Sequence, residues 1–144
     1  MQVRSRSITL LFLITYQCTF AQLKTDRKKI SATRITTPPK IDGILNENAW
    51  KNAELIKDFI VFRPENGKKV ANEYRTIVKV IYNDEAIYIS AMMHDPEPDK
   101  IPMQFATRDN FSQADFFLAT INPNDDGQNP FEFVVQSTGN QADS

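Results

Sequence analysis

The sequence predicts an all-β protein, specifically an antiparallel β-sandwich of the immunoglobulin-like or jelly-roll type with one short helix. Three observations support this prediction. Apolar, β-branched and aromatic runs of strand length recur along the chain, turn-forming residues separate most of them, and only one short segment has helical spacing. A length of 144 residues suits one domain rather than two.

The clearest element is a hairpin predicted over residues 76–82 and 87–93. Both runs are rich in Val, Ile and Tyr, which fit a pleated, half-buried surface, and Asn83 and Asp84 between them tolerate turn dihedrals. The second run has almost no polar residue, which predicts a position at the centre of a sheet. The other strands are expected to lie around this pair.

The remaining elements follow from similar local signals. Residues 30–36 are a candidate first strand, which ends at the proline pair 38–39 because proline fixes φ and lacks an N–H donor. Residues 47–53 are predicted to form a short helix with Asn46 as its N-cap and Trp50 on its apolar face. Further strands are predicted over residues 55–62, 116–121 and 131–137.

Residues 1–21 have the pattern of a cleaved signal peptide. Arg4 and Arg6 precede an apolar run over residues 8–16 that is too short to span a bilayer. The segment ends at Ala21, with a small residue where a signal peptidase reads. The protein is therefore predicted to be exported to the periplasm, the outer membrane or the extracellular space.

After the signal peptide, the predicted organisation is a leader and first strand over residues 22–37 and an incomplete β-sandwich over residues 38–144. Cys18 leaves lipoprotein processing open as an alternative to simple cleavage. Cleavage after the signal peptide removes this single cysteine, so no disulfide is expected in the mature chain. The chain reaches Ser144 just after a hairpin turn at 138–140, and a covalent continuation into a larger C-terminal region is expected.

Composition argues against several classes of function. The net charge of −1 is unsuited to a nucleic-acid partner, since phosphate binding needs a basic face. His94 is the only histidine, so no Ser–His or Cys–His nucleophile system is evident. A zinc site usually needs more His or Cys ligands than this chain has. A glycosidase requires two carboxylates positioned on either side of the bond that it cleaves. The acidic residues here cluster in turns, and no two of them stand out as such a pair. The chain is therefore expected not to be an enzyme.

Two acidic loops are candidate sites for a hard cation such as calcium. Residues 122–127 have the opening pattern of a calcium loop, but Phe133 stands where the bidentate acid belongs, so a plain turn is the alternative. In residues 95–99, acids alternate with prolines, and a solvated loop is the alternative there. The candidate metal ligands are Asp95, Asp125 and Asp126.

The order of motifs resembles a known family. Residues 39–53 read P-K-I-D-G-I-L-N-E-N-A-W-K-N-A, similar to the opening of carbohydrate-binding module family 9, and the hairpin with the D-P that follows it continues the resemblance. The chain is also similar to the N-terminal domain of certain bacterial outer-membrane barrel proteins of unknown function. In those domains R-D, then D, then F-x-F-x-V-x-x-x-G-x-Q-x-D recur, here as Arg108-Asp109, Asp115 and residues 131–143.

Modules of this family are calcium-containing β-sandwiches that bind sugar chain ends. The resemblance implies a non-catalytic domain that acts in carbohydrate catabolism, binds an oligosaccharide or polysaccharide, and is appended to a hydrolase or an outer-membrane protein. Two family positions depart from the pattern, because the ligand-binding acid falls at Leu118 and the ligand-binding Arg at Val134. The sugar-binding residues that the resemblance indicates are Phe111, Arg108, Asp109 and Asp115.

The departures favour an alternative function: a protein-interaction or cap domain of an outer-membrane barrel, with no sugar site. Two residue roles also have alternatives. Trp50 is expected to lie in the core, with a sugar platform as the other reading. Arg108 and Asp109 are either a functional pair or a structural ion pair that fixes the loop before residues 116–121.

Overall fold

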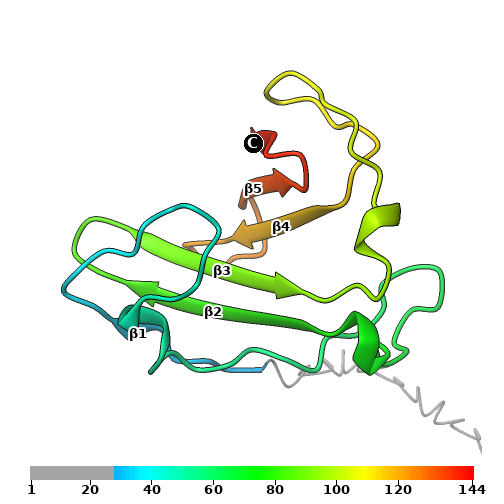
Figure 1. Cartoon of the computed structure of the whole chain (residues 1–144). Coiled ribbons are helices and arrows are strands. Elements are labelled where there is room, and N and C mark those ends of the chain that lie inside the picture. Colours follow the sequence, from blue (N-terminus) through cyan, green and yellow to red (C-terminus); the bar gives the residue numbers. More distant parts are fainter. Residues whose placement is uncertain (1–27) are drawn as a thin grey trace, which may run out of the picture.

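The computed structural model describes residues 28–144, so the predicted signal peptide and most of the leader before Ile30 lie outside the described residues. The described chain is all-β with very little helix, because each helical element is a single 3₁₀ turn (Figure 1). In order, the elements are β1 (Thr33–Arg34), η1 (Asn48–Trp50), η2 (Asn72–Tyr74), β2 (Thr76–Tyr82), β3 (Ile87–Met93), η3 (Pro98–Lys100), β4 (Phe116–Ile121), β5 (Phe131–Gln136) and β6 (Gln141–Asp143).

The first sheet has the order β1-β2-β3, with β1 parallel and β3 antiparallel to β2. The predicted hairpin is confirmed with both strand bounds as expected. The prediction that its second strand lies at the centre of the sheet is wrong, because β2 is the central strand and β3 is an edge. The apolar run indicated burial of both faces, but most side chains of β3 are exposed, including Ile87, Met92 and Met93. Such a run also carries no information about which edge of the strand is paired.

Asn83 closes the hairpin turn through both its side chain and its main chain. Its Oδ1 accepts hydrogen bonds from the main-chain N–H groups of Glu85 (3.0 Å) and Ala86 (2.8 Å). Its own N–H donates to the carbonyl of Ala86 (3.0 Å). The turn predicted at Asn83 and Asp84 is therefore confirmed, and the hydrogen bonds of the Asn83 side chain add to it.

The predicted helix over residues 47–53 is reduced to the 3₁₀ turn η1. Its N-cap is Glu47 rather than Asn46, and no side chain caps it. Glu47 instead accepts at Oε1 from the main-chain N–H of Lys40 (3.0 Å). The carbonyl of Trp50 accepts from Nζ of Lys79 on β2 (2.8 Å), so a tertiary bond holds the end of this turn.

Two predicted strands are shorter than expected. The strand over residues 30–36 is confirmed only as β1. The strand over residues 55–62 is reduced to two isolated bridges, Ile56 with Val78 and Ile60 with Lys69. Asp58 lies between these bridges with φ of +62°, a left-handed conformation that interrupts an extended chain.

The core of the first sheet forms around Trp50, which is 4% exposed and packs with Ala53 and Ile81. The expectation that Trp50 is a core residue is confirmed. The indole Nε1 has no hydrogen-bond partner among the described residues. Partly buried side chains complete the cluster: Ile35, Leu45, Ala49 and Tyr88.

The second sheet has the order β4-β5-β6 and is antiparallel throughout. The strand predicted over residues 116–121 is confirmed, and that over residues 131–137 is confirmed to within one residue. Strand β6 was not predicted, because only three residues form it and none is β-branched or aromatic.

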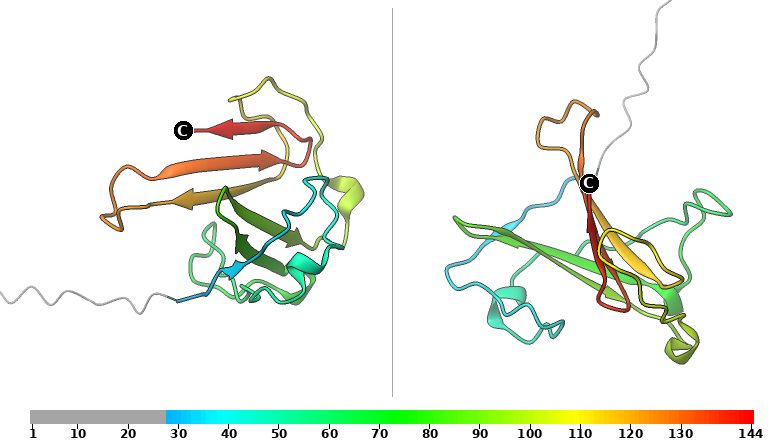
Figure 2. Two further views of the ribbon diagram at one scale, coloured as in Figure 1. Left: turned by 90° about the vertical axis from the view of Figure 1, so that its left-hand side faces the viewer. Right: turned by 90° about the horizontal axis from the view of Figure 1, so that it is seen from above.

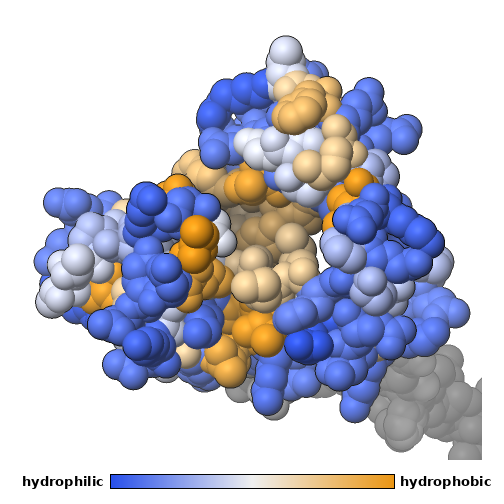
Figure 3. Space-filling view, viewed as in Figure 1, coloured by the Kyte–Doolittle hydropathy of each residue, from blue (hydrophilic) through white to orange (hydrophobic). Residues whose placement is uncertain are grey.

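The two sheets are arranged crosswise. Figure 2 shows the second sheet beyond the β3 edge of the first, with its strands running across the direction of β2 and β3. Figure 3 shows an apolar hollow over β2 and β3. A cavity of about 260 Å³ lies on this face, lined by Leu45, Leu55, Ile77, Lys79, Ser90 and Met92. No helix within residues 28–144 is long and apolar enough to cross a membrane.

Candidate functional site

The loop before β4 is held against the second sheet by the buried side chain of Gln136. This amide is 3% exposed and lies at the end of β5. Its Oε1 accepts from the main-chain N–H of Ser112 (3.2 Å), and its Nε2 donates to the carbonyl of Asn110 (2.9 Å). The side chain of Asn140 also donates to the carbonyl of Ala106. These bonds fix the segment that carries the predicted sugar-binding residues.

Arg108 and Asp109 lie along the open edge of β6. The main-chain N–H of Asp109 donates to the carbonyl of Gln141 (3.1 Å), which places the loop beside that strand. Arg108 donates from Nη2 to Oδ1 of Asp143 on β6, and its Nε lies 3.8 Å from Oδ1 of Asp109. Arg108 is therefore shared between two carboxylates, and its closer partner is Asp143 rather than the neighbouring Asp109.

Phe111 presents an open aromatic ring above the same sheet. It is 62% exposed. Phe111 packs edge-to-face against Phe116, with 5.6 Å between the ring centroids and 73° between the ring planes. Edge-to-face packing fixes the orientation of an aromatic ring while leaving one side accessible.

These residues surround a shallow cavity of about 130 Å³, which we call the Phe111 site. It is lined by Asp109, Phe111, Glu132, Val134, Ala142, Asp143 and Ser144. Val134 is buried, pairs with Leu118 on β4 and with Ala142 on β6, and gives the site an apolar floor. Three carboxylates and an aromatic ring stand around that floor, so the site combines hydrogen-bond acceptors with an apolar stacking surface.

Two of the four predicted sugar-binding residues, Asp109 and Phe111, line the Phe111 site, Arg108 adjoins it through its ion pair with Asp143, and Asp115 lies outside it. Asp115 lies just before β4, where its carbonyl accepts from the N–H of Ser137 (2.7 Å) in the β5–β6 turn. Sequence reasoning missed Glu132 and Asp143 as members of the site. A usable signal existed for Asp143, since it is the last residue of the G-x-Q-x-D motif.

The predicted metal ligands do not meet in one cluster, and no group of three potential ligating side chains occurs within residues 28–144. Asp95 accepts from the N–H of Glu97 (2.7 Å) within its own loop. Asp126 accepts from the N–H of Gln128 (2.8 Å) and the side chain of Asn122 (3.1 Å), and these two bonds lower the pKa of its carboxyl. Asp125 has a left-handed backbone conformation in the same turn. The calcium site stays a prediction.

Comparison of the chain with protein-family models, with curated proteins and with solved structures gives no significant match. The resemblance to carbohydrate-binding module family 9 therefore rests on the motifs of the sequence alone.

Proposed function

We propose that the chain is an exported, non-catalytic carbohydrate-binding domain that takes an oligosaccharide or polysaccharide at the Phe111 site. One observation carries the proposal. The exposed ring of Phe111 is held by Phe116 directly beside the carboxylates of Asp109 and Asp143, in a shallow cavity open to solvent. An aromatic platform with polar groups at its rim is what a sugar ring requires, because a pyranose has an apolar C–H face and a hydroxyl periphery.

Each part of the site has a distinct role in this proposal. The Phe111 ring stacks on the C–H face of one sugar unit, while the carboxylates accept hydrogen bonds from its hydroxyl groups. Arg108 keeps donors beyond those used on Asp109 and Asp143, and these can reach a ring or glycosidic oxygen. The site is small and exposed, so binding is weak and suited to keeping an attached catalytic or membrane domain near a polymer.

We also propose that the two sheets form part of a sandwich of the crossed type. The crosswise strands in Figure 2 support this arrangement, since orthogonal packing is one of the two usual ways in which sheets pack. The domain would then be one module of a larger exported protein, with calcium as a structural ion.

A thermal melt of the exported chain with soluble cello-, xylo- and malto-oligosaccharides tests the proposal. A ligand at 100 times its dissociation constant stabilises by about 2.7 kcal/mol, which shifts the melting temperature of a domain of this size by several degrees. We expect one class of sugar to produce this shift. A cooperative melt that no sugar moves would contradict the proposal.

The second candidate function is a protein-interaction or cap domain, and the outer edge of β3 favours it. Within residues 28–144, no strand or bridge pairs with that edge. Ile87, Met92 and Met93 on this strand are all exposed. An apolar edge without main-chain pairing, charge or proline is a template for pairing with another chain. Stabilisation by a polypeptide partner, and by no sugar, would support this function.

A further inference from the structure

A gap in the hydrogen-bond ladder beside β2 forms a cavity. Ile56 and Val78 exchange both main-chain hydrogen bonds, at 2.8 and 2.9 Å. Continued pairing in this register would bring Asp58 opposite Thr76, two residues further along each chain. Asp58 instead adopts φ of +62°, and the chain turns away from β2. The next main-chain bond runs from the N–H of Val70 to the carbonyl of Phe59 (3.5 Å).

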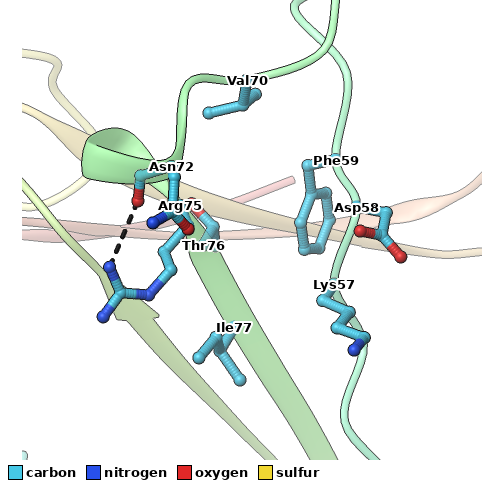
Figure 4. Close-up of a pocket in the computed structure, with 8 residues that line it drawn as sticks. All are labelled: Lys57, Asp58, Phe59, Val70, Asn72, Arg75, Thr76 and Ile77. Atoms are coloured by element: carbon cyan, nitrogen blue, oxygen red, sulfur yellow. Dashed lines mark hydrogen bonds between the residues drawn. The ribbon is translucent and has the colours of Figure 1, made fainter.

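The resulting cavity, which we call the ladder-gap pocket, has a volume of about 330 Å³. Its lining consists of Lys57, Asp58, Phe59, Val70, Asn72, Arg75, Thr76 and Ile77. Figure 4 shows the ring of Phe59 facing β2 across the opening, with Val70 above it. This volume lies at the lower end of the range for ligand pockets, so the pocket admits one compact group rather than a long chain.

The main chain of Thr76 supplies an unpaired donor and acceptor at this pocket. In an antiparallel pair, successive residues direct their main-chain groups to opposite edges of the strand. The N–H and the carbonyl of Val78 both bond to Ile56, and the carbonyl of Tyr82 accepts from the N–H of Ile35 (2.8 Å). The main-chain groups of the even-numbered residues of β2 therefore point to the edge away from β3. Thr76 follows the same alternation, and no residue between 28 and 144 bonds to its main-chain groups on that side.

The lining of the ladder-gap pocket combines an apolar surface with charged side chains, among them the cations Lys57 and Arg75. Phe59, Val70 and Ile77 provide the apolar surface. Arg75 donates from Nη1 to the carbonyl of Asn72 (3.2 Å) and forms no ion pair within the described residues. The carboxylate of Asp58 points away from the opening in Figure 4. The charge of Arg75 is therefore available to an anionic ligand.

We propose that the ladder-gap pocket binds the C-terminal residue of a polypeptide, with an apolar side chain at that residue. The main chain of this residue pairs with Thr76 and restores the missing rung of the ladder. Its side chain occupies the space between Phe59 and Ile77, and its carboxylate replaces the Asn72 carbonyl as the partner of Arg75. A free strand edge, an apolar surface and a guanidinium without an ion-pair partner together match the terminus of a peptide. This site is separate from the Phe111 site and does not depend on either proposed function.

Titrations with three small probes, followed by NMR chemical shifts of the exported chain, test this inference. N-acetyl-leucine should shift the resonances of residues around the pocket, and N-acetyl-leucine amide should bind about tenfold more weakly because it lacks the charge, a difference of about 1.4 kcal/mol. Glucuronate, which has a carboxylate but no apolar side chain, should not compete with N-acetyl-leucine.

Two variants locate the binding energy. Arg75→Gln should abolish the tenfold preference for the carboxylate over the amide while the protein stays folded, because the side chain is exposed. Phe59→Ala should weaken both leucine probes. The matched control is Arg63→Gln, which removes an exposed guanidinium that stacks on Phe62 outside the pocket. Equal binding of carboxylate and amide, preferential binding of glucuronate, no shift with any probe, or equal sensitivity to Arg63→Gln would each overturn the proposal.

Discussion

Arg108 donates to the carboxylate of Asp143, 35 residues further along the chain. This ion pair joins the loop before β4 to the open edge of β6, and so forms one rim of the Phe111 site. The two side chains are 63% and 53% exposed. The pair therefore orders the rim of the site, and its contribution to the free energy of unfolding is small.

A double-mutant cycle with Arg108→Gln and Asp143→Asn should give a coupling energy of about 0.2–1 kcal/mol, the range of exposed ion pairs. Urea unfolding of the wild type, both single variants and the double variant provides the measurement. The coupling should fall as salt is raised, since exposed charges are screened. A large coupling that salt leaves unchanged would show that the pair is buried in solution.

Trp50→Ala should lower the free energy of unfolding by about 3–5 kcal/mol, because it leaves a cavity in the buried cluster of the first sheet. Trp50→Phe should cost less, since it keeps much of the apolar volume and removes an Nε1 that has no partner among the described residues. The control is Phe62→Ala, at a ring that is 73% exposed and should change stability by no more than about 0.5 kcal/mol. Equal losses for Trp50→Ala and this control would contradict the described core.

The carboxyl of Asp42 should make the stability of the fold depend on acid pH. The main-chain N–H of Ile44, and then the Lys40 ammonium, lower the pKa of Asp42 below its ordinary value of 3.8. Because the pKa is lower in the folded state, Asp42 contributes its full share to the free energy of unfolding at pH values above 3.8, the pKa in the unfolded chain. This contribution is lost as the pH falls through the pKa of the folded state. Melting temperatures measured from pH 6 downward should therefore fall less steeply below 3.8 for Asp42→Asn than for the wild type. Parallel curves would refute the assignment.

Ile89→Lys should reduce self-association, because a charge on an edge strand opposes pairing with another strand. Ile89 lies on β3, whose outer edge is unpaired within the described residues. Light scattering at increasing protein concentration measures the effect. Ile44→Lys is the matched control, since Ile44 is an exposed apolar residue outside any strand. If both variants behave alike, general surface charge rather than the β3 edge governs association.

The strands that sequence reasoning located well are those whose signals are local. The hairpin of β2 and β3 has β-branched runs and an Asn turn in one continuous stretch, and β4 and β5 have aromatic and β-branched runs of full strand length. The failures have tertiary causes. The chain around Asp58 turns away from β2 because Asp58 has a left-handed backbone conformation. The last residue of η1 is held by a hydrogen bond from Lys79, which is 29 residues away in the sequence.

The Phe111 site was predicted in part for a similar reason. Arg108 and Asp109 form the R-D motif and Phe111 follows two residues later, so the resemblance could indicate all three from one short segment. Asp143 ends a recognisable motif, but its meeting with Glu132 in the same cavity follows from the pairing of β5 with β6, which local signals do not reveal. The ladder-gap pocket left no motif in the sequence at all, because it results from the absence of one expected pairing.

The most direct measurement compares Phe111→Ala with Phe62→Ala in calorimetric titrations against the sugar that raises the melting temperature of the wild type. Both rings are exposed, so both variants should stay folded. If Phe111 is the platform, Phe111→Ala should weaken sugar binding at least tenfold, or about 1.4 kcal/mol, while Phe62→Ala binds like the wild type. Unchanged affinity in Phe111→Ala would contradict the assignment of the sugar site to the Phe111 site.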